Sequence, residues 1–309
     1  MTRKLDFIVF GLPRGGTTAV SNYISAAQGF HCGVEVFPTF LDHATLDIPQ
    51  GFLTRQHKLW NGSSVEEITA HGDQIQVYGN KTPTYFYRLP SLLEDLDNCP
   101  AIACVRDLRS VATSYSKRAA DANDPWIEGR VGLFAMGDAL LLLHALHNTP
   151  KGSRVLVLPQ GALLADWRAV MTRALAHIAP SELQGKEPDF DADKLTVINR
   201  IKTREEQREK PALDPVEERA LKRLTRDGVM DFFTRPEPVL LDDVRDEIAA
   251  ILAKTPPNPV AFVRHKAEEH PNPKVQDFFK TWSRHAGQAW RRYRPNAPAG
   301  AGTAVPSTN

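Results

Sequence analysis

Two short segments of this sequence carry residue types that bind anions, and the first lies near the N-terminus. Gly11–Thr18 reads Gly-Leu-Pro-Arg-Gly-Gly-Thr-Thr and separates an apolar run from a helical pattern. Backbone N–H groups at a helix start, together with the positive end of the helix dipole, favour a phosphate or sulfate. Glycines let the anion approach the backbone, while arginine and threonine side chains add a charge and hydroxyl donors. The residues expected at this anion are Arg14, Gly15, Gly16, Thr17 and Thr18.

The same loop lacks two widespread nucleotide-binding patterns. It has no Gly-Lys-[Ser/Thr] ending, which in nucleoside triphosphatases supplies a lysine for the terminal phosphates and a Mg²⁺ ligand. It also lacks the GxGxxG spacing of dinucleotide sites. Magnesium-dependent ATP chemistry and dinucleotide binding are therefore disfavoured.

The second anion-binding segment follows another apolar run about 90 residues later. Arg106 comes directly after Ala101–Val105, and Ser114 lies eight residues further along, about two turns of a helix. A planar guanidinium offers two parallel donors to a phosphate. The alternative is that Arg106 only pairs with Asp107 at a helix start, an interaction worth little when it is exposed.

Alternating strand and helix patterns position both segments. Apolar runs rich in β-branched residues predict strands at 5–10, 101–105 and 154–158. Continuous apolar strands are typical of a parallel sheet covered on both faces. Helical patterns are found at about 18–27, 91–96, 106–118, 133–146, 162–178, 214–227 and 242–254. The repeated units predict an α/β fold, a three-layer sandwich with a central parallel sheet.

Composition excludes several classes of protein. The 309 residues include 38 Lys+Arg and 37 Asp+Glu, a net charge of +1, so nothing in the overall charge favours nucleic acid. The longest apolar stretch, 133–146, is too short to span a bilayer and the N-terminus lacks a signal-peptide pattern. Cys32, Cys99 and Cys104 have no paired CxxC spacing, so we expect neither a disulfide framework nor zinc. A cytoplasmic protein with no transmembrane segment is predicted.

The C-terminal part has a different pattern. We expect a main domain at 1–255, a helical extension packed on it at 256–294, and a disordered, Pro/Gly-rich tail at 295–309. The extension contains Phe278, Trp282 and a basic end. Docking of its aromatic side chains on the main domain is favoured over binding to a membrane or an acidic partner.

Together the two anion segments resemble the sulfotransferase family, which uses 3′-phosphoadenosine 5′-phosphosulfate (PAPS) as donor. Pro13–Thr18 is similar to the family loop Pro-Arg-Ser-Gly-Thr-Thr, which binds the 5′-phosphate end, with Gly15 in place of the commoner serine. Arg106 and Ser114 have the spacing of the family's 3′-phosphate ligands. The resemblance covers about residues 5–180, extends loosely to 235, and implies a P-loop-like sulfotransferase architecture.

The resemblance also implies two further catalytic residues beside Arg14. Glu35 lies where protein-tyrosine and heparan sulfotransferases place a glutamate base, and a base is needed because a neutral hydroxyl is a poor nucleophile. Lys81 begins a Lys-Thr-Pro segment similar to that of heparan-type enzymes. With Arg14 it would offset charge on the leaving phosphate, so no metal is implied. The alternatives are a surface glutamate and a solvated lysine, with His31 and His43 as other candidate bases.

The leading hypothesis is therefore transfer of a sulfuryl group from PAPS to an acceptor hydroxyl, with a carbohydrate or glycolipid as the expected acceptor. A nucleotide-dependent kinase of related architecture and a non-catalytic nucleotide- or anion-binding protein are the alternatives. Lys202 and Arg204 lie where relatives carry a loop that closes over the adenosine, but a solvated basic face is the competing interpretation. An aromatic wall for the acceptor could come from Trp60, Tyr78, Tyr85, Phe86, Tyr87 and Trp126, although scattered aromatic residues more often belong to the core. No oligomeric state is predicted.

Overall fold

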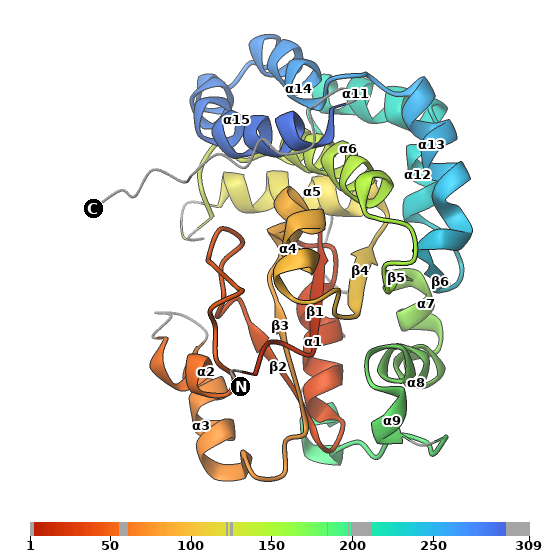
Figure 1. The fold of residues 1–309 in the computed structure, drawn as a ribbon. Helices are drawn as coiled ribbons and strands as arrows, with labels where there is room; N and C mark the ends of the chain where they lie inside the picture. Colours follow the sequence, from red (N-terminus) through yellow and green to blue (C-terminus); the bar gives the residue numbers. More distant parts are fainter. Residues whose placement is uncertain are drawn as a thin grey trace.

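A six-stranded sheet forms the centre of the protein, with the strand order β2-β3-β1-β4-β5-β6 (Figure 1). The computed structural model describes residues 3–55, 61–121, 123, 126–183, 185–196, 198 and 212–294, without the side chains of 61–64. The strands are β1 Phe7–Gly11, β2 Phe30–Val34, β3 Val77–Lys81, β4 Ala101–Val105, β5 Val155–Pro159 and β6 Val239–Leu240. The first five are parallel and β6 is antiparallel to β5. The predicted α/β class is confirmed, with an antiparallel edge strand too short to be predicted.

Helices cover both faces of this sheet. On one face pack α1 (Thr17–Ala26), α7 (Gln160–Ala165) and α8 (Trp167–Ile178), whose apolar residues form one buried cluster with alternate strand residues. The other face is covered by η1 (Pro83–Arg88), α4 (Leu89–Asp95), α5 (Leu108–Ala120) and α6 (Gly132–Asn148). The remaining elements are α2 Gln50–Thr54, α3 Asn61–His71, α9 Pro180–Leu183, α11 Pro215–Arg226, α12 Val229–Phe233, η2 Leu241–Val244, α13 Arg245–Lys254, α14 Pro259–Glu268 and α15 Pro273–Tyr293.

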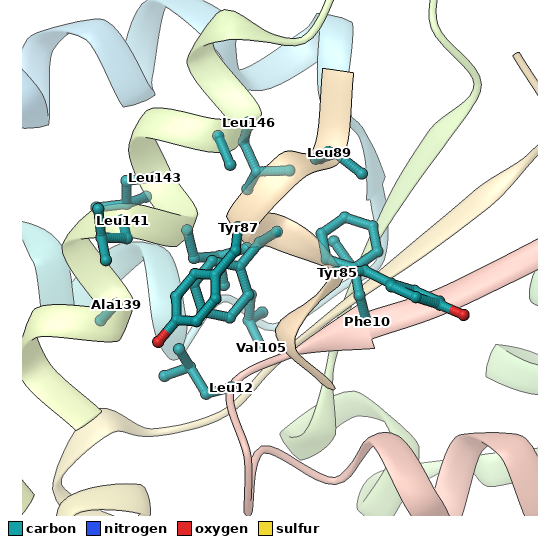
Figure 2. Close-up of a cluster of buried hydrophobic side chains, with 14 of the residues drawn as sticks. Phe10, Leu12, Tyr85, Tyr87, Leu89, Val105, Ala139, Leu141, Leu143 and Leu146 are labelled. Atoms are coloured by element: carbon teal, nitrogen blue, oxygen red, sulfur yellow. The ribbon is translucent and has the colours of Figure 1, made fainter. Parts of the chain in front are cut away.

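Helix α6 is the centre of the larger core. Its residues 132–146 are all buried, as a sequence that is apolar apart from Asp138 and His144 predicts. Figure 2 shows Leu141, Leu143 and Leu146 of this helix in one cluster with Tyr85 and Tyr87 of η1. Those tyrosines are 0% and 6% exposed, so they are core residues.

The expected aromatic wall for an acceptor is therefore corrected for most of its members. Tyr78 and Phe86 are 2% and 0% exposed, like the two tyrosines of η1. Trp126 is half-buried and its ring contacts Tyr115 and Arg130. Trp60 lies outside the described residues.

The expected helix at 162–178 is two helices. Asp166 ends α7 and its side chain accepts a hydrogen bond of 3.0 Å from the Ala169 amide, which caps α8. A short side chain that can cap a helix competes with continuation of that helix. The long apolar pattern concealed this break.

The C-terminal helices form an outer layer over α6, with α14 and α15 packed on it and on each other (Figure 1). In α15, Trp282 is 3% exposed and donates a 2.8 Å hydrogen bond to buried Asp138 of α6, which also accepts one of 2.8 Å from Tyr87. The Tyr293 hydroxyl donates to the Phe86 carbonyl. These contacts join the end of α15 to the segment that follows β3. The tail at 295–309 lies outside the described residues.

The expectations from composition concerned the cysteines and a transmembrane segment. All three cysteines are free and buried, and burial raises the pKa of each thiol, which makes them unreactive. Within the described parts of the chain, no helix is both long enough and apolar enough to cross a membrane.

Candidate active site

The first anion-binding loop lies at the carboxyl end of β1, where the chain order of the sheet reverses and ligands of α/β sheets bind. Gly16 precedes α1 with φ of 90°, a left-handed conformation that glycine adopts without cost. At Gly11 (φ 151°), an added Cβ would lie 2.2 Å from the Cys104 carbonyl oxygen. The Gly15 amide donates to the Leu12 carbonyl at 2.8 Å, which closes the turn. These glycines are required by the shape of the loop.

The two anion-binding segments meet at this edge of the sheet. Arg14 Nε donates to Ser114 Oγ at 3.1 Å, and Arg106 Nη1 donates to the Arg14 carbonyl oxygen at 3.0 Å. Arg14 itself has a left-handed backbone, with φ of 64°. Arg106, Ser114 and the loop are thus brought together as their sequence motifs predict.

Asp107, considered above as an ion-pair partner of Arg106, forms hydrogen bonds to the start of α5. Asp107 is the N-cap of α5, and its carboxylate accepts hydrogen bonds from the amides of Arg109 (3.3 Å) and Ser110 (2.9 Å). A carboxylate in this position satisfies the free amides of the first helical turn. Asp107 thus orients the helix that carries Ser114.

Glu35 and Lys81 form the second part of the site. Lys81 Nζ donates to Glu35 Oε1 at 2.7 Å, with side chains 1% and 41% exposed. The Glu35 amide also donates to the Lys81 carbonyl at 2.7 Å. A buried ammonium requires such a partner because its desolvation is costly. Lys81 is therefore not the solvated lysine of the alternative interpretation, and Glu35 presents a carboxylate both to Lys81 and to solvent.

The two parts of the site are adjacent through the sheet. Lys81 is in register with Val9 of β1, two residues before the anion loop begins at Gly11. The Thr82 amide then donates to the Val9 carbonyl at 3.1 Å. A carboxylate, a buried ammonium, two guanidinium groups and a helix start therefore lie at the carboxyl ends of four adjacent strands, β2, β3, β1 and β4. This set can bind a dianionic group and remove a proton beside it.

Neither histidine considered as an alternative base is placed for that role. His43 is fully buried, bonded through Nδ1 to the Leu41 carbonyl (2.8 Å) and in contact through Nε2 with the Tyr85 hydroxyl (3.3 Å). Burial lowers its pKa to about 4. His31 is 2% exposed and contacts Glu67 at 3.2 Å. Of the three candidates, Glu35 alone is substantially exposed.

One neighbour of the loop was not predicted from the sequence. The Gln160 side chain lies 3.3 Å from the position of a Cβ added to Gly16, and both residues line a shallow depression with residues of β4, β5, α1 and α7. Gln160 directly follows β5. Because carboxyl ends of parallel strands meet at one edge, this position could have been recognised from the third strand pattern.

Other expectations concern metals and the basic segment after 199. Among the residues that the structure describes, no group of three His, Cys, Asp or Glu side chains could hold a metal ion. Lys202 and Arg204 lie outside the described residues.

Comparison with known proteins was made by sequence and by structure. The sequence model of the sulfotransferase family matches residues 6–180, more than half of the 309 residues. Among solved structures, the sulfotransferase domain of the olefin synthase from Synechococcus PCC 7002 is similar, with a TM-score of 0.45 and 14% identity over 75% of this chain and 94% of that domain. A search of curated proteins found no match.

Proposed function

The chain belongs to the sulfotransferase family, whose general reaction is sulfuryl transfer, and on that basis we propose that it uses PAPS as donor and a hydroxyl group as acceptor. Adenosine 3′,5′-bisphosphate is the second product. The observation that carries the proposal is the junction of Arg14, Ser114 and Arg106 beside the helix-start loop. It supports a donor with two separated phosphate groups.

In this proposal the loop binds the 5′-phosphosulfate end of the donor. The backbone amides of Gly16–Thr18 and the start of α1 favour its negative charge, while the Gly15 amide closes the turn. Arg106 and Ser114 bind the 3′-phosphate, the guanidinium through charge-assisted hydrogen bonds. Arg14 contacts Ser114 and would act between the two phosphate sites. No metal ion is needed because the cations are supplied by side chains.

Glu35 and Lys81 carry the chemical step. The acceptor oxygen attacks sulfur while the S–O bond to the 5′-phosphate breaks, and Glu35 takes the hydroxyl proton. The bisphosphate leaves with an additional negative charge. Lys81, whose Nζ lies 2.7 Å from Glu35 Oε1, stabilises that developing charge in surroundings where electrostatic interactions are strong. Sulfur keeps its oxidation state, and the electron pair of the broken bond stays with the phosphate oxygen.

For the acceptor we propose a carbohydrate or glycolipid hydroxyl. This assignment is supported by the glutamate base and by the Lys81-Thr-Pro83 segment, which are the features shared with heparan-type enzymes. The half-exposed carboxylate of Glu35 is open to a bulky acceptor. A phenol, which would depend on aromatic stacking, has less support because the nearby tyrosines are buried.

The alternatives make different predictions for nucleotide binding. A kinase would bind ATP with magnesium, and a non-catalytic binder would bind the bisphosphate without turnover. We would titrate the purified protein calorimetrically with adenosine 3′,5′-bisphosphate without magnesium, and with ATP both without and with magnesium. The proposal expects micromolar affinity for the bisphosphate and weak binding of ATP.

The Arg106→Ala variant makes this titration residue-specific. Loss of its charge-assisted hydrogen bonds, about 2–3 kcal/mol, would weaken bisphosphate binding about 30- to 140-fold. Arg109→Ala is the matched control, because Arg109 is half exposed and pairs with Glu218. Equal losses in both variants, or no bisphosphate binding by the wild type, would refute the proposed donor.

A further inference from the structure

The Glu35–Lys81 contact requires an unusual backbone at the end of β2. Side chains alternate between the two faces of a strand, and Val34 is in register with Lys81. In an extended strand, Glu35 would therefore point to the face opposite Lys81, on which Asn80 lies. Glu35 instead has φ of 59°, a left-handed conformation that non-glycine residues rarely adopt. This conformation returns its carboxylate to Lys81.

A buried amide holds the residues that directly follow Glu35. Asn80 is 0% exposed; its Oδ1 accepts a hydrogen bond of 3.2 Å from the Val36 amide, and its Nδ2 donates to the Phe37 carbonyl at 3.3 Å. The same Nδ2 lies 3.1 Å from Thr82 Oγ1 and 2.5 Å from the Tyr85 hydroxyl. One side chain thus binds both the amide and the carbonyl of the turn.

The partners of Asn80 strengthen this attachment. Thr82 Oγ1 and the Tyr85 hydroxyl also donate to the Phe37 carbonyl, at 2.9 and 2.8 Å, and both side chains are buried. Hydrogen bonds shielded from water are stronger than exposed ones and costly to leave unmade. The network is therefore positioned to fix a backbone conformation that the strand itself disfavours.

We propose that Asn80 is the positioning residue for the base, because it ties residues 36–37 to β3 and so holds the Glu35 carboxylate at Lys81. Neighbouring residues of β3 act from opposite faces of the sheet. Lys81 contacts the Glu35 carboxylate directly on the α1 face, while Asn80 fixes the backbone after Glu35 from the other face. The inference rests on the proposed function, in which Glu35 is the base. Asn80 itself touches neither substrate nor the reacting atoms in this assignment.

The test compares the wild type with Asn80→Ala and with Thr149→Val. Thr149 is also buried and loses one hydrogen bond, to the Ala145 carbonyl, but lies at the end of α6, away from the site. Crystal structures would report φ at Glu35 and the Nζ–Oε1 contact. Titration with adenosine 3′,5′-bisphosphate would report the donor site, and sulfuryl transfer from PAPS would give kcat and KM.

In Asn80→Ala we expect Glu35 to leave the left-handed region and its contact with Lys81 to be lost. Bisphosphate affinity and the KM for PAPS should stay within about twofold of wild type, whereas kcat should fall about 10- to 100-fold, the effect of a misplaced catalytic group. Thr149→Val should keep wild-type kcat and an unchanged Glu35 contact.

The outcomes separate this inference from the proposed function. If Glu35 keeps its φ and its Lys81 contact in Asn80→Ala, the positioning role is wrong, whether or not the protein turns over PAPS. If wild type binds no bisphosphate, the proposed donor is wrong, and the crystal structures still decide whether Asn80 fixes the turn. An equal fall of kcat in both variants would mean that general loss of stability, not positioning, explains the effect.

Discussion

Removal of Glu35 and removal of Lys81 should have unequal effects on the free energy of unfolding. Glu35→Ala leaves the Lys81 ammonium, which is 1% exposed, buried without the carboxylate that neutralises it. Lys81→Met removes the buried charge itself, fills a similar volume, and leaves a carboxylate that is 41% exposed to be solvated by water. The first variant should therefore be clearly destabilised and the second only slightly.

The magnitudes follow from the burial of each partner. Breaking a fully buried ion pair by removing one partner costs about 3–5 kcal/mol. Because water can enter the space left by half-exposed Glu35, we expect about 2 kcal/mol for Glu35→Ala, below that range. Replacing a buried charge by an apolar side chain is often neutral or stabilising, so Lys81→Met should change the free energy of unfolding by less than about 1 kcal/mol.

Urea denaturation of both single variants and of the double variant measures these values. The double variant should be within about 0.5 kcal/mol of Lys81→Met, because no buried charge remains to be left unpaired. Both single variants should lose transferase activity. A Lys81→Met variant that is destabilised as much as Glu35→Ala, or more, would refute the argument that the buried ammonium is the costly partner.

Three further predictions concern the scaffold. Gly11→Ala should destabilise the protein by about 3 kcal/mol, because the added Cβ clashes with the backbone and the positive φ strains a residue with a side chain. Gly161→Ala in α7, with open space around it, should be neutral or stabilising by up to about 1 kcal/mol. Thermal unfolding compares the two variants. Burial lowers the pKa of His144 to about 4, so below its unfolded value of about 6.5 the unfolded state binds the extra proton and stability falls towards pH 4. His144→Phe should reduce this loss by up to about 1.4 kcal/mol per pH unit. The free energy of unfolding would be measured at pH 7, 6 and 5, and the same dependence on pH in the variant and the wild type would contradict the prediction. Glu217, 1% exposed, accepts hydrogen bonds from two backbone amides and a serine hydroxyl, so Glu217→Ala should cost about 3 kcal/mol. Glu218, 30% exposed, is paired with half-exposed Arg109, so Glu218→Ala should cost less than about 1 kcal/mol; similar urea midpoints would contradict the difference.

The arrangement of the two candidate anion-binding segments could be predicted because the geometry of each segment is local. Arg106 and Ser114 are eight residues apart at a strand end and on the following helix, so their spacing alone places them on related turns. The loop before α1 is equally local, since glycine positions and a helix start define it. Only the meeting of the two segments, through the Arg14–Ser114 contact, depends on the pairing of β1 with β4.

The contact between Glu35 and Lys81 could not be predicted from the sequence. Glu35 and Lys81 are 46 residues apart and meet because β2 pairs with β3. These strands read Phe-His-Cys-Gly-Val and Val-Tyr-Gly-Asn-Lys, with glycine and polar residues that conceal a strand pattern. Asn80 and Lys81 are nevertheless 0% and 1% exposed. The left-handed backbone at Glu35 has no sequence signal at all, because glutamate does not favour it.

Transfer of radioactive sulfur from [³⁵S]PAPS tests the central claim most directly. Wild-type protein and Glu35→Ala would each be incubated without metal ions with a panel of carbohydrate, glycolipid and phenolic acceptors. The account predicts label on a carbohydrate or glycolipid acceptor, with release of adenosine 3′,5′-bisphosphate, and loss of transfer in Glu35→Ala. Binding of the bisphosphate without transfer to any acceptor would contradict catalysis and favour a non-catalytic binder, and transfer undiminished in Glu35→Ala would contradict the assignment of the base.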